Sequence, residues 1–314
     1  MSTWSCTTPV IPQRADPYIL RHNGEYLFTA SVPEYDRIVL RRAKTIAGLA
    51  NAEEKVIWRA HASGEMSWHI WAPEIHQIDG TWCVYFAAGE RDDIWKIRIW
   101  VLSNSSPDPM EGEWTERGQI KPNWDSFSLD ATVLELRGKR YLLWAQNDPK
   151  IGPGTSIYLA EMDGPTAIKG TQTRITTPEH PWEVIGHRVN EGPAVLRRNG
   201  RIFVTFSASA TDHNYCMGLL WMDENADPTD PKSWHKKPEP IFCTTETAKA
   251  FGPGHNSFTV AEDGKTDLLV YHARPYPGAN PDPLRDPNRH TRVQPFTWDS
   301  EGFPVFGAPL PESK

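Results

Sequence analysis

The most regular feature of this sequence is one pattern of apolar and polar positions that occurs five times. In each copy, an apolar run is followed by a short polar turn containing glycine and then by an aromatic-rich return run, which is typical of a β-hairpin. The turn glycines lie about 60 residues apart and are Gly24, Gly80, Gly138, Gly200 and Gly264. The pattern predicts five hairpins, which cover residues 16–28, 72–86, 130–144, 191–207 and 255–271.

Each hairpin is followed by further strand-like segments, such as residues 37–43 and 55–59 in the first repeat. A lone four-stranded sheet cannot bury both of its faces, and repeats of this length bury them by stacking around an axis. The prediction is therefore an all-β protein, a five-bladed β-propeller that forms a single domain over residues 1–314. Its blades are expected to start near residues 16, 72, 130, 191 and 255. The segment 1–14 is expected to pair with the edge of the last blade.

The residues at the heads of the five hairpins are Asp16, Ala72, Asp130, Glu191 and His255. In a propeller the first strand of each blade lies against the central axis, so the heads are expected to converge at one end of it. Four of these five heads can ionise, which is costly in a core and useful in a site. The heads therefore predict a functional site at one mouth of the axis.

Composition narrows the possible partners of that site. The chain has 314 residues and a formal net charge of -7 at pH 7. Nucleic-acid binding needs concentrated positive charge, and the Arg and Lys residues are scattered, so we expect a neutral or weakly charged ligand and no nucleic acid. No run approaches the roughly 18 consecutive apolar residues of a membrane span, so no membrane association is expected.

Cysteine usage and the N-terminal sequence bear on the compartment. The four cysteines, Cys6, Cys83, Cys216 and Cys243, contain no Cys-x-x-Cys pair, so no disulfide framework is expected. The segment 1–13 lacks the basic start and apolar run of a signal peptide. As written, the chain is expected to be a cytoplasmic monomer, or to be secreted with its signal removed.

Two carboxylic acids that face each other across a small pocket are the minimum equipment for breaking a glycosidic bond. One protonates the leaving oxygen, and the other activates water or attacks carbon. Asp16 and Glu191 fit these roles, and Asp130 would hold the acid in place and raise its pKa by like-charge repulsion. The alternative is that each of them only caps a strand entry as a turn residue. Three carboxylates at one register of the repeat favour the catalytic interpretation.

Each blade start also carries a distinct motif. The motifs are Ala15-Asp16-Pro17-Tyr18-Ile19, Trp71-Ala72-Pro73-Glu74-Ile75-His76, Ser128-Leu129-Asp130-Ala131, Asn190-Glu191-Gly192-Pro193 and Gly252-Pro253-Gly254-His255-Asn256-Ser257. Together they resemble glycoside hydrolase family 43, five-bladed propeller enzymes that act on arabinose- and xylose-containing polysaccharides. The resemblance covers nearly the whole chain. It implies that Asp16 is the general base, Glu191 the general acid and Asp130 the modulator of the acid's pKa.

Within that family, the segment 29–37 and the Glu74-Ile75-His76 sequence most resemble the exo-acting α-L-arabinofuranosidases that trim 1,5-linked arabinan. The resemblance implies an inverting hydrolase that releases terminal L-arabinofuranose from arabino-oligosaccharides or arabinan. The alternatives are a β-xylosidase or an endo-arabinanase of the same family, or a non-catalytic carbohydrate-binding propeller, against which the intact trio of carboxylates argues. The Pro-rich segment 275–287 is expected to close one side of the pocket. No accessory carbohydrate-binding domain is expected.

Four further residues are candidates for binding. His255 resembles a family histidine that helps to hold a calcium ion or its waters in the central channel, and the alternative is a histidine bonded to its neighbours. No cofactor is expected to be required for the chemistry, with a structural calcium as an option. Trp71 and Phe127 are candidates to stack on a sugar ring, against the alternative of packing between blades. Arg292 matches a family arginine that faces the site and braces Asp130, against the alternative of a surface arginine.

Overall fold

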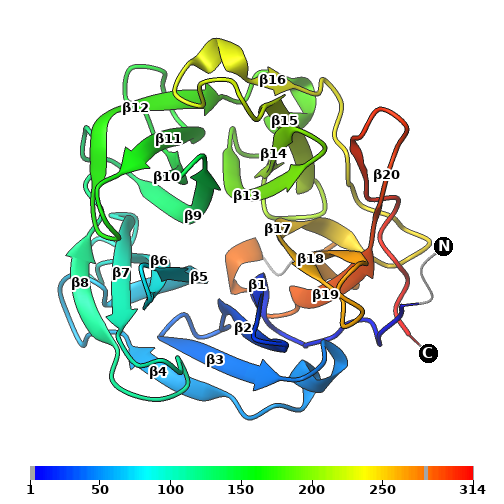
Figure 1. Cartoon of the computed structure of the whole chain (residues 1–314), viewed down its shortest axis with the longest axis horizontal. Helices are drawn as coiled ribbons and strands as arrows, with labels where there is room; N and C mark the ends of the chain where they lie inside the picture. Colours follow the sequence, from blue (N-terminus) through cyan, green and yellow to red (C-terminus); the bar gives the residue numbers. More distant parts are fainter. Residues whose placement is uncertain (1–3, 279–281, 314) are drawn as a thin grey trace.

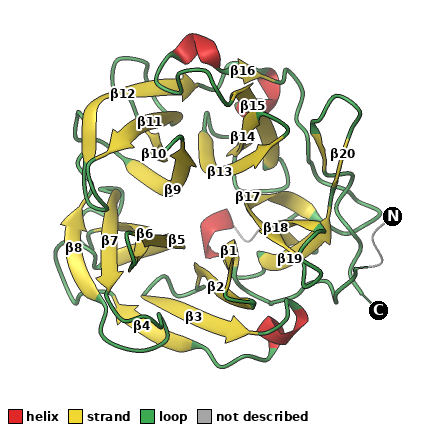
Figure 2. Cartoon of the chain, in the orientation of Figure 1, coloured by secondary structure: helices red, strands yellow, loops and turns green. Residues whose placement is uncertain are grey.

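The computed structural model describes residues 4–278 and 282–313, and in it the chain forms a ring of five antiparallel sheets around a central axis (Figure 1). The strands within each blade follow one another in sequence order from the axis outward. The prediction of an all-β, five-bladed propeller is therefore confirmed. Figure 2 shows that strands and loops make up nearly all of the ring.

The strands of the first two blades are β1 (Ala15–His22), β2 (Glu25–Ser31), β3 (Arg37–Ala43) and β4 (Lys55–Arg59), then β5 (Trp68–Ile78), β6 (Thr81–Gly89), β7 (Arg98–Asn104) and β8 (Thr115–Gln119). The third and fourth blades contain β9 (Ser128–Leu136), β10 (Lys139–Gln146), β11 (Ser156–Met162) and β12 (Ile168–Thr176), then β13 (Asn190–Arg198), β14 (Arg201–Ala208), β15 (Cys216–Asp223) and β16 (His235–Lys236). The fifth blade is a sheet of β17 (Phe251–Val260), β18 (Asp267–Arg274) and β19 (His290–Pro295).

The N-terminal segment of the chain forms the outer edge of the fifth blade. Ile11 makes an antiparallel bridge with Thr291 of β19, and the Val10 N–H donates to the Thr291 carbonyl at 2.9 Å. The segment 304–306, which has enough strand character for a fourth strand, instead contributes β21 (Pro304–Val305) to a separate hairpin with β20 (Thr297–Trp298). The predicted pairing of the N-terminal segment with the last blade is therefore confirmed. Figure 1 shows both chain ends beside this blade.

The hairpin turns have the backbone that the glycine pattern predicts. In four of them the glycine and the residue before it both have positive φ, as in Asn23 (49°) and Gly24 (79°). Two consecutive left-handed residues define a type I′ turn, whose twist matches that of the flanking strands. The fifth hairpin differs, because Ala261 N–H donates to the Thr266 carbonyl and the turn is longer. That extra length moves the head of the fifth blade one residue further from its glycine.

The apolar core lies between neighbouring blades. One cluster joins Tyr85 of the second blade to Leu142, Trp144 and Tyr158 of the third. The indole of Trp144 and the ring of Tyr85 are both fully buried there. Burial of such aromatic surface is the main force that holds adjacent blades together. Apolar packing is thus satisfied between the blades, and the mouth of the axis is left for polar side chains.

Helical structure in the described part of the chain consists of four short 3-10 helices, Ala47–Ala50, Pro181–Glu183, Pro231–Ser233 and Pro283–Arg285. Figure 2 places one helix over the central opening of the ring, next to β1. Across residues 4–278 and 282–313, no helix has the length and apolar character needed to cross a bilayer. The cysteines at 6, 83, 216 and 243 are free.

Candidate active site

The first strand of every blade has a β-bulge near its start, with one residue in the left-handed region. These residues are Asp16 (φ 53°), Ala72 (44°), Asp130 (57°), Gly192 (54°) and His255 (43°). Pairing with the second strand shifts register at this point in each of the five blades. Positive φ is uncommon outside glycine, and such strain is kept where the surrounding structure and function require it. The repeated bulge is therefore the device that aims the heads into the axis.

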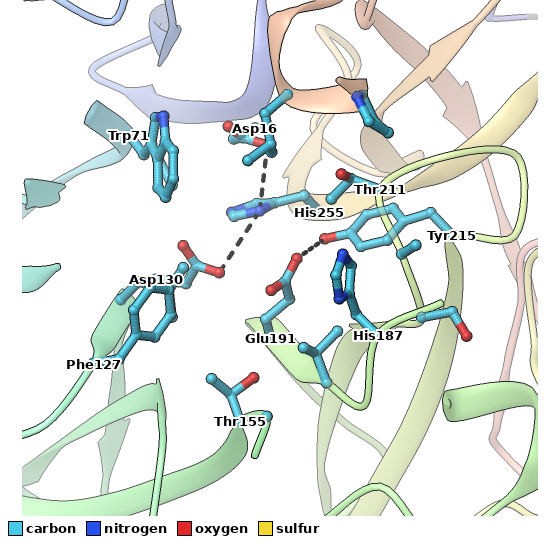
Figure 3. A pocket seen from close by; sticks show the side chains of 18 of the residues that line it. Asp16, Trp71, Phe127, Asp130, Thr155, His187, Glu191, Thr211, Tyr215 and His255 are labelled. Atoms are coloured by element: carbon cyan, nitrogen blue, oxygen red, sulfur yellow. Dashed lines mark hydrogen bonds and ion pairs between the residues drawn. The ribbon is translucent and has the colours of Figure 1, made fainter. Parts of the chain in front are cut away.

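Glu191 is offset by one residue from the other predicted heads. The left-handed position of the fourth blade is held by Gly192, whereas Glu191 precedes it. The spacing from the turn glycine did not distinguish this offset from the extra residue in the fifth turn. Figure 3 shows the result, with Glu191 across the pocket from Asp16 and the ring of His255 between them.

The backbone N–H groups at these bulges lie outside the strand ladder, and side chains of neighbouring segments accept them. The pairs are Asp16 N–H to His272 Nδ1 at 3.1 Å, Ala72 N–H to Ser31 Oγ at 2.8 Å, Gly192 N–H to Asp130 Oδ2 at 3.0 Å and His255 N–H to Ser207 Oγ at 2.7 Å. A buried N–H without an acceptor is costly, so these contacts stabilise the strained heads. They also tie the site residues of one blade to those of the next.

The heads converge on a pocket of about 570 Å³ at one mouth of the axis. Asp16, Asp130, Glu191 and His255 all line it. The Ala72 head lines it too and contributes no ionisable group. A concave pocket with a few convergent polar groups is the usual form of a small-molecule site. The pocket is large enough for more than one sugar ring.

Asp16 is held as a carboxylate. Its Oδ2 accepts from the Ser31 hydroxyl at 2.6 Å, and its Oδ1 lies 3.4 Å from both Arg289 Nη1 and His255 Nδ1. Burial would raise the pKa of Asp16, but the charges of Arg289 and His255, together with His272, hold that pKa well below its ordinary value. Burial lowers the pKa of His272 to about 3, so its Nδ1 is free to accept the Asp16 N–H. A buried carboxylate whose pKa lies well below its ordinary value is ionised at neutral pH and is able to accept a proton from water.

The pKa values of Asp130 and Glu191 are both raised, in contrast to that of Asp16. Burial raises the pKa of Asp130, and the negative charges of Glu191 and Asp16 add to the increase. Burial likewise raises the pKa of Glu191, against the hydrogen bond from Tyr215 (Oη to Oε1, 2.8 Å) and the charge of His255. Two interacting carboxyl groups titrate as a pair. The pair is therefore able to keep a proton at a pH where Asp16 has lost its own, which gives the pocket both a base and an acid.

His255 contacts the carboxylates directly. Its Nδ1 lies 3.4 Å from Asp16 Oδ1 and 3.9 Å from Asp130 Oδ2. Burial opposes protonation of the ring, but Asp130, Asp16 and Glu191 raise the pKa of His255. Among the residues that the structure describes, no three His, Cys, Asp or Glu side chains are grouped to hold a metal ion. A calcium held through water near His255 stays a prediction.

The aromatic candidates both lie on the pocket. Trp71 and Phe127 line it, and the indole of Trp71 stacks on His69 with ring centroids 4.3 Å apart. Trp95 lines the pocket as well, and 54% of its surface is exposed. Figure 3 shows Trp71 and Phe127 on the side of the pocket that carries Asp130. Their contact with a sugar ring stays a prediction.

The prediction that Arg292 faces the site and braces Asp130 is wrong. Its guanidinium is buried and donates to Glu312 Oε1 at 2.8 Å and to the carbonyls of Lys249 and Leu310. Arg289, three positions earlier, is the arginine that lines the pocket and approaches Asp16. Arg292 lies within β19 and contacts Lys249 and the C-terminal residues Leu310 and Glu312, whereas Arg289 precedes that strand.

The sequence analysis did not identify three residues that support the carboxylates: Arg289, His272 and Tyr215. Arg289 follows the Pro-rich segment, His272 lies on a second strand, and Tyr215 directly precedes a third strand. Arg289 and Tyr215 lie outside the strands, where the repeat gives no signal. His272 holds the second-strand position that Ser31 and Ser207 hold in the first and fourth blades, an equivalence that depends on the strand register.

Comparisons with known proteins point to one family. The profile of Glycosyl hydrolases family 43 matches residues 6–304. The chain is 57% identical over 269 residues to a Streptomyces chartreusis protein named extracellular exo-α-(1→5)-L-arabinofuranosidase, which covers 85% of this chain and 82% of that protein. A Streptomyces avermitilis protein of the same name is 54% identical over 305 residues, or 97% of this chain, and the chain spans 63% of its length.

A solved structure gives the same agreement in three dimensions. The crystal structure of an α-L-arabinofuranosidase from Lactobacillus brevis superposes with a TM-score of 0.95 and 54% sequence identity. The match covers 98% of this chain and 98% of that chain. The two chains therefore share the propeller over nearly their full lengths.

Proposed function

The chain belongs to glycosyl hydrolases family 43, and from that premise we propose that it is an inverting, exo-acting α-L-arabinofuranosidase. Its proposed substrates are α-1,5-linked arabino-oligosaccharides or arabinan, from which it releases terminal L-arabinofuranose. The observation that carries the proposal is the convergence of Asp16, Asp130 and Glu191, from three blades, on one pocket. The names of the two Streptomyces relatives support the choice of sugar and linkage.

In the proposed reaction, a water molecule between Asp16 and the anomeric carbon loses a proton to Asp16 as its oxygen attacks that carbon. The glycosidic bond breaks, and Glu191 gives its proton to the leaving oxygen. Inversion requires room for that water, which corresponds to catalytic carboxyl groups roughly 6.5 to 9.5 Å apart. Placement of Asp16 and Glu191 on the first and fourth blades, with His255 between them, supports the wider spacing. The titrations of Asp130 and Glu191 are coupled. This coupling supports the role of Asp130 as the modulator of the pKa of Glu191.

Exo action is supported by the wall that the Pro-rich segment forms. Asp282, Pro283 and Leu284 line the pocket, while Pro281 lies outside the described residues. Tyr35 of the first blade donates its hydroxyl to the Leu284 carbonyl. Arg274 donates to the Pro283 carbonyl at 2.6 Å. A wall anchored from two blades blocks one side of the pocket and leaves room for a chain end.

The first test is a panel of substrates. Nitrophenyl α-L-arabinofuranoside and arabino-oligosaccharides should be hydrolysed with arabinose as the first product, and nitrophenyl β-D-xyloside should be a poor substrate. Proton NMR in the first minutes should show β-L-arabinofuranose from the α-linked substrate, because the water attacks the face opposite the leaving group. An initial α-anomer would make Asp16 a nucleophile. Arabinobiose and arabinotriose as first products would indicate an endo-arabinanase, a preference for the xyloside a β-xylosidase, and no hydrolysis a binding propeller.

Arg289→Met should shift the acidic limb of the pH profile of kcat/KM to higher pH. Removal of the guanidinium raises the pKa of Asp16, and Asp16 must be ionised to act as a base. Arg292→Met is the matched control, because it removes a buried guanidinium that contacts Glu312 instead. The control should lower the melting temperature and leave the limb in place. An unmoved limb in Arg289→Met would show that this arginine does not maintain the charge of Asp16.

Location and assembly are also part of the proposal. The Streptomyces relatives are named as extracellular enzymes, which supports secretion over a cytoplasmic location. We propose that the chain acts as a monomer, since each site residue identified above comes from one chain. Light scattering of the purified protein tests this directly, and a dimer mass would contradict it.

A further inference from the structure

The phenol of Tyr215 is the one polar side chain that hydrogen-bonds to the Glu191 carboxyl group in the described part of the chain. Its Oη donates to Glu191 Oε1 at 2.8 Å, and the residue is 1% exposed. Tyr215 also lines the pocket, next to the carboxyl group that it contacts (Figure 3). We propose that Tyr215 is a positioning residue for the acid, Glu191. Its hydrogen bond occupies Oε1 of Glu191, so Oε2 carries the catalytic proton and directs it at the leaving oxygen. This inference rests on the proposed function, in which Glu191 is the acid.

The position of the phenol is fixed by packing between the fourth and fifth blades. A Cβ on Gly254 would lie 2.5 Å from Cε1 of the Tyr215 ring, so only glycine allows the ring to sit there. A second contact is with His272, the cross-strand partner of Gly254, whose ring is parallel to that of Tyr215 within 5° at a centroid distance of 5.7 Å. The ring therefore has little freedom, and the hydroxyl stays within reach of Glu191.

The direction of the hydrogen bond between Tyr215 and Glu191 determines which oxygen of Glu191 carries the proton. The His255 N–H donates to Ser207 Oγ at 2.7 Å, so the Ser207 hydroxyl proton is available to another acceptor. Ser207 acts to lower the pKa of the Tyr215 phenol, against the much larger increase caused by burial. The phenol itself donates its proton to Glu191 Oε1. A carboxylic acid carries its proton on one oxygen, and Oε1, as the acceptor, is the oxygen without it.

The same contact acts on the product of proton transfer. When Glu191 has given its proton away, the new carboxylate accepts a hydrogen bond from a phenol that is already in place. Hydrogen bonds to ionised groups are about twice as strong as those between neutral groups. A donor that is positioned before the reaction stabilises the developing charge without reorganisation. Tyr215 thus favours proton donation as well as its direction.

The test is Tyr215→Phe, which keeps the packed ring and removes the hydroxyl. On arabino-oligosaccharides kcat should fall about 10- to 100-fold, with KM nearly unchanged. The alkaline limb of kcat/KM should move to higher pH, because the carboxylate of Glu191 loses a stabilising donor. Nitrophenyl arabinofuranoside should suffer less, since a good leaving group needs little protonation. Gly254→Ala, which displaces the ring and keeps the hydroxyl, should change kcat and the limb in the same directions.

Two parallel variants separate the possible failures. Tyr271→Phe removes another buried hydroxyl, whose partner Gln294 lies outside the pocket, and should lower stability without moving the limb. If Tyr215→Phe behaves like Tyr271→Phe, or harms both substrates equally with an unmoved limb, Tyr215 is only structural and the inference is overturned. If Glu191→Gln keeps its activity, the assignment of the acid fails instead.

Discussion

Glu191→Gln should lower kcat on arabino-oligosaccharides by about a hundred- to ten-thousand-fold, the range that a general acid contributes. Glutamine has nearly the shape of the acid and keeps an oxygen for the Tyr215 hydroxyl, so the fold and substrate binding should persist. What is lost is the proton that burial helps Glu191 to retain. Steady-state kinetics on a natural substrate, with binding followed by calorimetry, measure the two effects separately.

A comparison of substrates with different leaving groups shows whether Glu191→Gln loses activity because it lacks a general acid. Nitrophenolate leaves with little protonation, so Glu191→Gln should keep far more of its activity on the nitrophenyl substrate than on an oligosaccharide. Glu54→Gln is a matched control, since Glu54 is paired with Arg14 and Arg41 away from the pocket. Equal losses on the two substrates would show that Glu191 is not the acid.

Asp16→Asn should abolish activity to a similar extent on both kinds of substrate. The water must be deprotonated whichever group leaves, and the general base contributes about a hundred- to ten-thousand-fold. The variant also leaves the positive charges of Arg289 and His255 without their partner, so it should melt at a lower temperature than the native protein. A kinetic comparison with oligosaccharide and nitrophenyl substrate, run beside Glu191→Gln, measures the contrast.

A matched surface substitution, Asp79→Asn, tests whether the chemical change itself is harmful. Asp79 pairs with Arg140 at an exposed hairpin turn outside the pocket, so its loss should leave activity intact. If Asp16→Asn instead spares the nitrophenyl substrate, as expected for loss of an acid, the roles of Asp16 and Glu191 would have to be exchanged.

The repeat in the sequence was sufficient to predict the architecture. Asn-Gly and Asp-Gly turns flanked by apolar runs are a short-range signal, and their recurrence implies stacked units. The same spacing identified Asp16, Asp130 and His255, because residues at one register of a propeller share one location. The spacing identified Glu191 as well, and its offset from the left-handed position became visible only in the backbone.

The supporting residues were beyond the reach of the pattern for a physical reason. The contacts of Arg289, His272 and Tyr215 with the carboxylates join residues that are 24 to 273 positions apart in the chain. Such contacts depend on the register between strands and on the path of loops, neither of which a one-dimensional pattern contains. The error over Arg292 has the same origin, because the pattern does not show which arginine near β19 reaches the pocket.

The bridge between Ile11 and Thr291 has a consequence for how the ring is made during synthesis. The strand that completes the last blade leaves the ribosome first, and its partner emerges 280 residues later. Until then, the segment around Ile11 has no strand to pair with, and unpaired strand edges are prone to pairing with other chains. Contacts this distant in sequence also slow folding, since a long loop must close before they form. The growing chain therefore passes through an aggregation-prone intermediate in which the ring is not yet closed. The lifetime of this intermediate depends on the rate of translation.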